Sequence, residues 1–399
     1  MTLTDTHTTE PAAASAGSKL GIIDTDFHPM PVPTDPQIAE NLPERWQSYI
    51  ARYGLGSFGG GVAPSQREFT HRLDAVDASG RVGVDPHRAV EQVLDPFDMS
   101  AVVLTCPQAY IITSGGANMP HDCAWALYRA YNDALVRTWV AADSRFRASI
   151  TLPRDLAGAE QEIVRCKEGP NGDSYVQVLI SPAGQEPLGR QRYWPIFEAC
   201  EHYDIPLAFH VPGMGRQPTG AGRQNFYSEM HAAFAVLPLS MIPSLVFEGV
   251  FERFPRLKIA LLELGWDWAV PFSWRLDATY DKLRDEVPHL NRRPSEYLRE
   301  HFWFSTQPIE EPEHLEEIPH VYAMFEESGF ADRLMFSSDY PHWDYDSPYE
   351  SVPESFPLDR RRRILGENAS ALYGIPLLPG HGIDARSAVA PHGIPAAGV

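Results

Sequence analysis

Short apolar segments alternate along the chain with longer segments in which apolar residues recur every three or four positions. Eight of the short segments are rich in β-branched or aromatic residues and lack a strict alternation of polar and apolar residues. Strands that are buried on both faces of a parallel sheet have this composition. The predicted strands span residues 19–28, 99–107, 146–153, 174–182, 205–212, 257–264, 302–308 and 333–341.

The longer segments predict amphipathic helices. We expect them at residues 121–142, 156–168, 192–204, 239–255, 270–287 and 358–374, the last of which ends on a glycine that can cap it. Eight strand-then-helix units in series favour an α/β fold built as a single (β/α)8 TIM barrel, with an open doubly wound sheet as the alternative. Two insertions interrupt the series, at residues 29–98 after the first strand and at residues 213–236 after the fifth. Connections of this length are often functional.

The barrel is expected to occupy residues 19–375, between two segments that have little to bury. Residues 1–18 lack the basic start and apolar centre of a secretory signal and are predicted to be a flexible tail. Residues 376–399, rich in Gly, Pro and Ala, are predicted to be a loose tail or an arm on a partner subunit. We therefore expect a homo-oligomer, or an assembly with a paralogous subunit.

Composition limits the classes of function. The 399 residues carry a formal net charge of -20, which repels phosphate backbones and argues against nucleic-acid binding. No run approaches the ~18 apolar residues of a membrane span. The four cysteines form no close CxxC pair, which predicts reduced thiols in a cytoplasmic enzyme.

Polar residues concentrate at the carboxyl ends of the predicted strands. Asp26 and His28 end the first strand two positions apart, so both side chains can point to the same side. The later strand ends carry His210 on the fifth strand, Glu263 on the sixth, and Asp339 on the eighth with His342 just beyond. Because loops after barrel strands meet at the catalytic face, we expect these four distant segments to converge.

Imidazole and carboxylate groups without a thiolate suit a divalent ion such as Zn, Mn or Fe. Taken singly, Asp26 can be a turn cap, and His28 or His210 can be a satisfied core residue. An acid such as Glu263 inside an apolar run is costly unless it is paired or metal-bound. The shared location favours a metal site, at which bound water becomes a hydroxide nucleophile and Asp339 can carry the proton.

Five stretches of the chain carry a family resemblance: "IIDTDFHP", "LAFHVPG", "VFEGVFERFPRLKIALLELGWDWAVPFSWRLD", "MFSSDYPHWD" and "ILGENASALYG". From about residue 19 to 375 the chain resembles the amidohydrolase superfamily, in the branch that includes the aromatic and aminocarboxymuconate-semialdehyde decarboxylases. The resemblance implies a metal held by Asp26, His28, His210 and Asp339, with the substrate over the carboxyl-terminal face of the barrel. Asp24, which leads the first motif, is expected to be structural.

Two positions depart from that branch. The first-strand position that is His or Glu in many members is Asp26 here, which remains a competent metal ligand. The decarboxylases of the branch carry a catalytic His after the sixth strand, where this chain has Glu263. The second departure counts against decarboxylation.

We therefore expect hydrolysis of a small, carboxylated substrate by a metal-bound hydroxide, with Asp339 as base and Glu263 or His231 assisting proton transfer. Non-oxidative decarboxylation is one alternative. A second is a dinuclear iron or manganese oxygenase that works with a reductase, as the resemblance allows for a few superfamily members. Its two ions would draw on seven candidate ligands: Asp26, His28, His210, His231, Glu263, Asp339 and His342. A third alternative is a non-catalytic subunit that supports an active paralogue.

Overall fold

A computed structural model describes residues 19–54, 70–109, 119–153, 157–182, 186–211, 226–308 and 312–385. Eight parallel strands follow one another in chain order, from β2 to β9. They are β2 (Ile23–Phe27), β3 (Ala101–Leu104), β4 (Phe146–Thr151), β5 (Tyr175–Ile180), β6 (Leu207–His210), β7 (Ile259–Leu262), β8 (Phe302–Ser305) and β9 (Leu334–Met335). Each predicted strand is present, and the barrel expectation is confirmed.

The last strand returns to the first. The amide of Thr25 donates to the carbonyl of Phe336 at 3.1 Å, and the amide of His28 donates to the carbonyl of Tyr340 at 2.8 Å. A parallel bridge joins Phe27 to Tyr340. These contacts close the sheet where the first and last strand ends meet.

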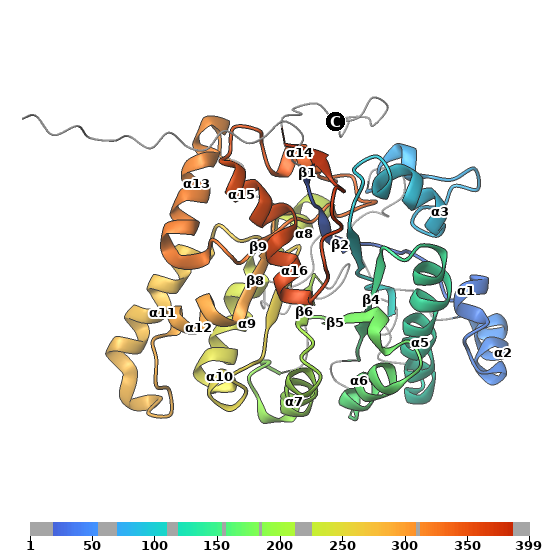
Figure 1. The fold of residues 1–399 in the computed structure, drawn as a ribbon. Coiled ribbons are helices and arrows are strands. Elements are labelled where there is room, and N and C mark those ends of the chain that lie inside the picture. Colours follow the sequence, from blue (N-terminus) through green and yellow to red (C-terminus); the bar gives the residue numbers. More distant parts are fainter. Residues whose placement is uncertain are drawn as a thin grey trace, which may run out of the picture.

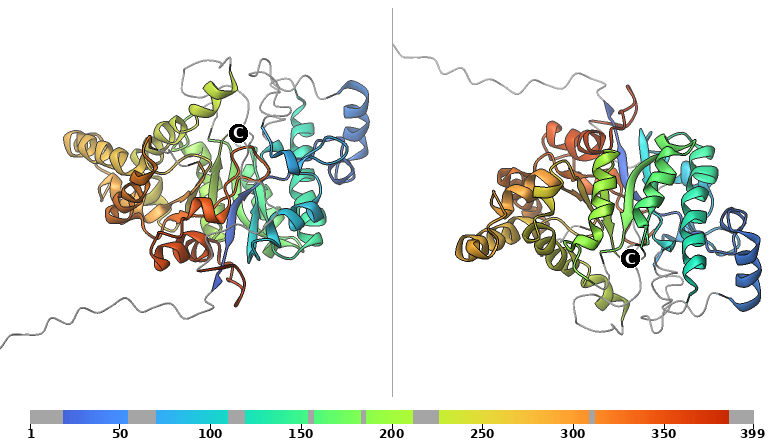
Figure 2. Two further views of the ribbon diagram at one scale, coloured as in Figure 1. Left: turned by 90° about the horizontal axis from the view of Figure 1, so that it is seen from above. Right: turned by 90° about the horizontal axis from the view of Figure 1, so that it is seen from below.

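Helices lie around the outside of the strands (Figure 1), and Figure 2 shows the same ring of helices from above and below. The helices are α1 (Pro36–Ala39), α2 (Glu44–Tyr53), α3 (Pro86–Ala89), α5 (His121–Ala134), α6 (Ala159–Glu168), α7 (Trp194–His202), α8 (Tyr227–Ala232), α9 (Val236–Phe247), α10 (Val250–Arg253), α11 (Ala269–Leu283), α12 (Pro294–His301), α13 (Ile318–Phe325), α14 (Pro348–Ser351), α15 (Leu358–Arg362) and α16 (Asn368–Tyr373). As expected, the closing helix ends on a glycine, Gly374, whose left-handed φ of 67° caps it.

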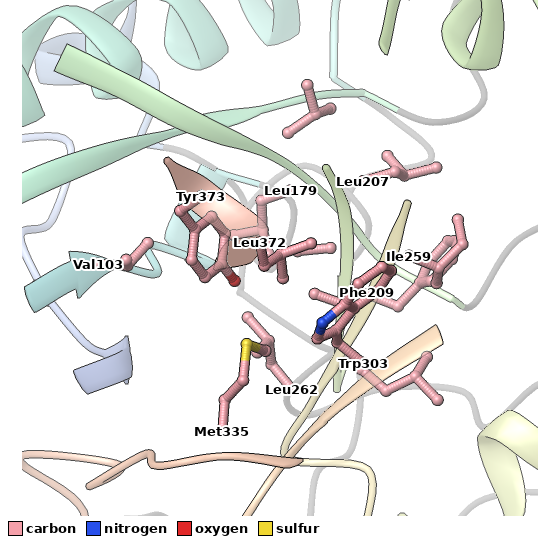
Figure 3. Close-up of a cluster of buried hydrophobic side chains, with 14 of the residues drawn as sticks. Val103, Leu179, Leu207, Phe209, Ile259, Leu262, Trp303, Met335, Leu372 and Tyr373 are labelled. Carbon is pink, nitrogen blue, oxygen red and sulfur yellow. The ribbon is translucent and has the colours of Figure 1, made fainter. Parts of the chain in front are cut away.

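The strands are buried on both faces, which explains why they are apolar without alternation. Every residue of β2, β3, β6, β7 and β8 is buried. Figure 3 shows part of this core, where Leu372 and Tyr373 of α16 lie among side chains of the strands. The Tyr373 hydroxyl donates to the Gln177 side-chain oxygen at 2.9 Å, so a polar contact anchors the helix to β5.

The first predicted strand is divided into β1 (Lys19–Leu20) and β2, and β1 leaves the barrel. It pairs antiparallel with β10 (Ile383–Asp384). Gly382 makes this pairing possible, because its φ is +105° and an added Cβ would lie 1.8 Å from the Leu20 carbonyl oxygen. Residues 376–385 of the segment 376–399 that was predicted to be loose thus include a strand that pairs with β1, and the remaining residues of that segment lie outside the described residues.

The predicted tail at residues 1–18 and the Gly-rich part of the first insertion lie outside the described residues. The rest of that insertion contributes α1, α2 and α3, and the second insertion contributes α8. All four cysteines are buried free thiols, as expected. Among the helices that the structure describes, none is both long and apolar enough to cross a membrane.

Candidate metal centre

Five side chains of the predicted site meet at the carboxyl ends of four strands. Asp26 lies in β2 and His28 follows it, His210 ends β6, Glu263 follows β7, and Asp339 lies beyond β9. All five are buried. The sequence prediction that these distant segments converge is thus met in the structure, although the roles of the residues stay predictions.

Two of the acids occupy an unusual backbone conformation. Glu263 has a φ of 52° and Asp339 a φ of 56°, in the left-handed region that L residues adopt at a cost. The surrounding structure holds both turns: the Glu263 amide donates to the Ser305 hydroxyl at 3.1 Å, and the Asp339 amide donates to the Asp26 carbonyl at 3.1 Å. Such conformations cluster at ligand-binding and catalytic sites.

The facing atoms are spaced like the ligands of one ion. Nε2 of His28 lies 3.5 Å from Oδ1 of Asp26 and 2.8 Å from Oδ1 of Asp339. Nε2 of His210 lies 3.6 Å from Oδ2 of Asp26 and 3.0 Å from Oε2 of Glu263. Atoms that bind one ion at about 2.1 Å lie roughly 3.0 Å apart in octahedral geometry and roughly 3.4 Å apart in tetrahedral geometry.

Backbone carbonyls fix the orientation of both imidazoles. Nδ1 of His28 lies 2.9 Å from the carbonyl oxygen of Thr105, and Nδ1 of His210 lies 2.9 Å from that of Val211. A carbonyl only accepts, so each Nδ1 carries a proton, and each Nε2 faces the acids. Metal-binding histidines are held by such outer contacts.

Several facing atoms lack a hydrogen bond within the described part of the chain. They are both carboxylate oxygens of Asp26, Oε2 of Glu263, Oδ2 of Asp339 and Nε2 of His28. Buried polar atoms are nearly always satisfied, and a buried unpaired charge is costly. A divalent cation fits this donor set, because it would satisfy the three carboxylates and both imidazole lone pairs together.

Burial and the neighbouring charges shift the pKa values of the three carboxyl groups. Burial raises the pKa of Asp26 to about 6, and nearby acids add to this effect. Burial and the charge of Asp339 raise the pKa of Glu263 well above its ordinary value. Burial also acts on Asp339, but its contacts with His342 and His28 hold its pKa below the ordinary range.

His342 lies at the edge of this centre. Its Nδ1 is 2.7 Å from Oδ1 of Asp339, and its ring centroid is 4.7 Å from that of His28. Burial lowers the pKa of His342, but the charge and hydrogen bond of Asp339 outweigh burial and raise it to about 10. Within the described residues, two groups have metal-ligand spacing: Asp26, His28, His210 and Glu263, and separately His28, Asp339 and His342.

His231 stands apart from both groups. It lies in α8, and its Nε2 is 3.0 Å from Oδ2 of Asp344. Its ring centroid is 5.5 Å from that of Trp343 and 5.8 Å from that of Tyr227. A metal-binding role for His231 remains a prediction, and the structure instead gives this imidazole a carboxylate partner.

Sequence reasoning missed three residues around the centre. Asp344 accepts from Nε2 of Gln307 at 2.9 Å as well as from His231. His71, from the first insertion, stacks on His342 with ring centroids 5.8 Å apart. Asp344 is the last residue of the quoted motif "MFSSDYPHWD", which was a usable signal, whereas nothing in the local sequence marks Gln307 or His71.

The chain is similar in sequence to known proteins over most of its length. The sequence model of the family described as Amidohydrolase matches residues 23–375. A gamma-resorcylate decarboxylase from Polaromonas sp. strain JS666 is 26% identical over 264 residues, which cover 61% of this chain and 75% of the relative. A gamma-resorcylate decarboxylase from Rhizobium radiobacter is 28% identical over 232 residues, which cover 53% of this chain and 65% of the relative, just under two thirds of its length.

Solved structures resemble this fold along nearly the whole chain. The dihydroxybenzoic acid decarboxylase of Polaromonas sp. JS666, with bound manganese and the inhibitor 2-nitroresorcinol, has a TM-score of 0.60 at 19% identity; the match covers 89% of this chain and 97% of that one. The 5-carboxyvanillate decarboxylase of Sphingomonas paucimobilis has a TM-score of 0.58 at 22% identity, covering 90% and 100%. At these identities the likeness shows the fold alone.

The expectation of hydrolysis by a metal-bound hydroxide is wrong. The curated relatives reported above are decarboxylases that share 26% and 28% of aligned residues with this chain, and they favour the decarboxylase alternative. The acid Glu263 at the end of the sixth predicted strand does not exclude decarboxylation, because the other candidate ligands of the centre are in place.

Proposed function

The chain belongs to the amidohydrolase family, and from this premise we propose that it is a metal-dependent, non-oxidative decarboxylase of a hydroxylated aromatic acid. Its relatives include gamma-resorcylate decarboxylases, which supports the reaction type. The observation that carries the proposal is the set of buried strand-end atoms that have no hydrogen bond within the described residues. Three carboxylates and two imidazoles at this spacing fit a divalent cation.

We assign the ion to Asp26, His28, His210, Glu263 and Asp339. Mixed carboxylate and imidazole ligands suit manganese, which the solved Polaromonas structure contains. We propose a single ion, because both groups of candidate ligands use the same Nε2 of His28. His342 then acts on the centre through its contact with Asp339 rather than as a separate anchor.

When bound, the divalent ion would supply a fixed positive charge for the substrate carboxylate and a neighbouring hydroxyl oxygen. The chain itself orients the ligands. A backbone carbonyl accepts a hydrogen bond from each imidazole, and the backbone amides of Glu263 and Asp339 donate hydrogen bonds that hold their left-handed backbone conformation. Aromatic residues stand at the edge of the centre, where Trp343 donates from Nε1 to the Tyr227 hydroxyl at 3.1 Å. Flat aromatic walls of this kind suit a planar ring.

The test is release of CO2 by the full chain, purified with manganese. We expect turnover of 2,6-dihydroxybenzoate or 5-carboxyvanillate, in which a hydroxyl flanks a carboxylate. The matched control is 3,5-dihydroxybenzoate, an isomer of 2,6-dihydroxybenzoate that has no hydroxyl beside the carboxylate. It should not react. A chelator should abolish turnover and manganese should restore it. CO2 release from neither substrate, with one manganese bound per chain, would overturn the proposal.

We also propose that the chain forms a homo-oligomer. Trp274 on α11 is 60% exposed, and aromatic side chains are enriched in the interfaces between subunits, so we choose it as the residue to test. Light scattering of the purified chain should give a multiple of the chain mass, and Trp274→Lys should lower it. A monomer at micromolar concentration would contradict this.

A further inference from the structure

A short segment of the first insertion pairs with the residues that follow β9. Two backbone hydrogen bonds join them, one from the Arg72 amide to the Pro341 carbonyl at 2.9 Å and one from the Trp343 amide to the Thr70 carbonyl at 3.2 Å. Between these two bonds, an antiparallel bridge sets His71 opposite His342. Residues paired in this way do not bond to each other through the backbone, and their side chains approach closely on one side of the pair. The backbone therefore places His71 beside His342.

The two imidazoles are stacked. Their ring centroids are 5.8 Å apart and their planes are inclined by 19°. The His342 ring also lies 4.7 Å from the ring of His28, and its Nδ1 is 2.7 Å from Oδ1 of Asp339. Because a carboxylate only accepts, Nδ1 of His342 donates to Asp339. His342 thus connects His71 with two residues of the proposed metal centre.

The hydrogen bond to Asp339 depends on the orientation of the His342 ring. The His342 side chain is 22% exposed, so solvent leaves room for other rotamers. Rotation about its side-chain bonds would carry Nδ1 away from the carboxylate. A nearly parallel ring packed beside it restricts this rotation. Outer partners of metal-binding carboxylates fix the direction of the carboxylate oxygens, and their loss typically costs about 10- to 100-fold in metal affinity or activity.

The residue after His71 anchors the segment. The Arg72 guanidinium donates to both carboxylate oxygens of Asp74, at 3.0 Å and 2.7 Å, and lies 4.1 Å from the centroid of the Tyr345 ring. Arg72 is buried, and its backbone is extended. Successive side chains of an extended segment point to opposite sides. Arg72 therefore fastens the segment to the residues beyond β9 from one side, while His71 faces His342 on the other.

We infer that His71 is a positioning residue, whose ring holds the His342 imidazole against Asp339 and so fixes that carboxylate for the divalent ion. The role belongs to the flat ring rather than to its nitrogen atoms, because the contact with His342 is a stack. His71 acts through His342 and is not itself a ligand. The link to catalysis rests on the proposed function, whereas the affinity for manganese tests the inference without turnover.

The experiment compares two replacements of His71 that separate the ring from its polar atoms. His71→Phe keeps a flat ring and removes the nitrogen atoms, whereas His71→Asn keeps a polar side chain and removes the ring. The matched control is His320→Asn, since His320 is an exposed histidine on α13. Isothermal titration of the metal-free full chain measures the affinity for manganese, and CO2 release from 2,6-dihydroxybenzoate gives kcat and KM. Thermal unfolding shows which variants fold, and His71→Ala replaces His71→Asn should the latter not fold.

His71→Asn should bind manganese about 10-fold more weakly than the wild type, because the Asp339 carboxylate loses its fixed orientation. His71→Phe should stay within about threefold of the wild type, since the stack on His342 is kept. In a His342→Ala background nothing is left for His71 to position, so adding His71→Asn should change the affinity by less than about twofold. Values of kcat/KM should follow the same order, and His320→Asn should behave as wild type.

A folded His71→Asn variant that binds manganese as tightly as the wild type would overturn the inference. A His71→Phe variant as weak as His71→Asn would also overturn it, because the nitrogen atoms rather than the stack would then matter. So would a full effect of His71→Asn in the His342→Ala background, since His71 would then act without His342. A wild type that binds manganese but releases no CO2 would overturn the proposed function alone, and one that binds no manganese would overturn both.

Discussion

Asp26 offers a test of the metal centre that needs no substrate. In the metal-free protein, burial raises its pKa from the ordinary 3.8 to about 6. A raised carboxyl pKa contributes stability that is present at low pH and is lost as pH rises through the folded value. With these two values, Asp26 withdraws about 1 kcal/mol of stability between pH 5 and pH 8. Asp26→Asn has no such group to titrate.

We therefore expect the free energy of unfolding of the metal-free Asp26→Asn variant to rise by about 1 kcal/mol relative to that of the metal-free wild type between pH 5 and pH 8. The difference between the two proteins matters, because His71 titrates in the opposite sense: burial and the charge of His342 lower its pKa to about 4, which favours folding as pH rises. That contribution is common to both proteins and cancels. Free energies of unfolding from urea titrations in the presence of chelator measure the gain.

With manganese bound, the wild type should be more stable than the Asp26→Asn variant. It should stabilise the wild type, because it binds the folded chain and not the unfolded one, and each tenfold loss of affinity in the variant removes about 1.4 kcal/mol of that stabilisation. Asp122→Asn is the matched control, since the Asp122 side chain is 78% exposed and should show neither effect. A variant that gains nothing with pH and binds manganese as tightly as the wild type would refute the reasoning on Asp26.

Two further substitutions probe the supports of the centre. Glu263→Gln keeps the shape of the side chain but removes a negative ligand, so manganese affinity should fall at least ~10-fold while the chain stays folded; isothermal titration measures this, and unchanged affinity would remove Glu263 from the ligand set. Ser338→Ala removes the hydroxyl that donates to the buried Asp24 and should destabilise the protein by about 1–3 kcal/mol. Ser79→Ala, at an exposed serine, is the control and should cost much less, and urea titration measures both free energies of unfolding.

The barrel could be predicted from the sequence because each strand is recognisable from its own residues. The strands are recognisable from continuous apolar runs, and the polar residues at their ends are visible as interruptions of those runs. Asp26 and Glu263 lie at such interruptions, so their convergence follows once the strands close into a barrel. Closure brings strand ends together regardless of the loops between them.

Other parts of the centre depend on loops, whose course the pattern does not contain. His71 reaches His342 from a long insertion, and Gln307 reaches Asp344 from the end of β8. The left-handed backbone of Glu263 and Asp339 is likewise invisible, because the residue type that usually marks it is glycine. The pairing of β1 with β10 joins residues more than 300 positions apart through short segments without periodicity.

The charge balance of the centre gives His342 a role that its position alone does not reveal. Three carboxylates carry one more negative charge than a divalent ion neutralises, so the centre with its ion would still repel an anionic substrate. In the metal-free protein, the contact with Asp339 raises the pKa of His342 to about 10, so that its imidazole is positively charged near neutral pH. The imidazolium lies beside Asp339 and offsets part of the negative charge of the three carboxylates. Where the resemblance implies an imidazole, this chain has Glu263, and a positive charge at His342 would lessen the repulsion that this acid exerts on a carboxylate substrate.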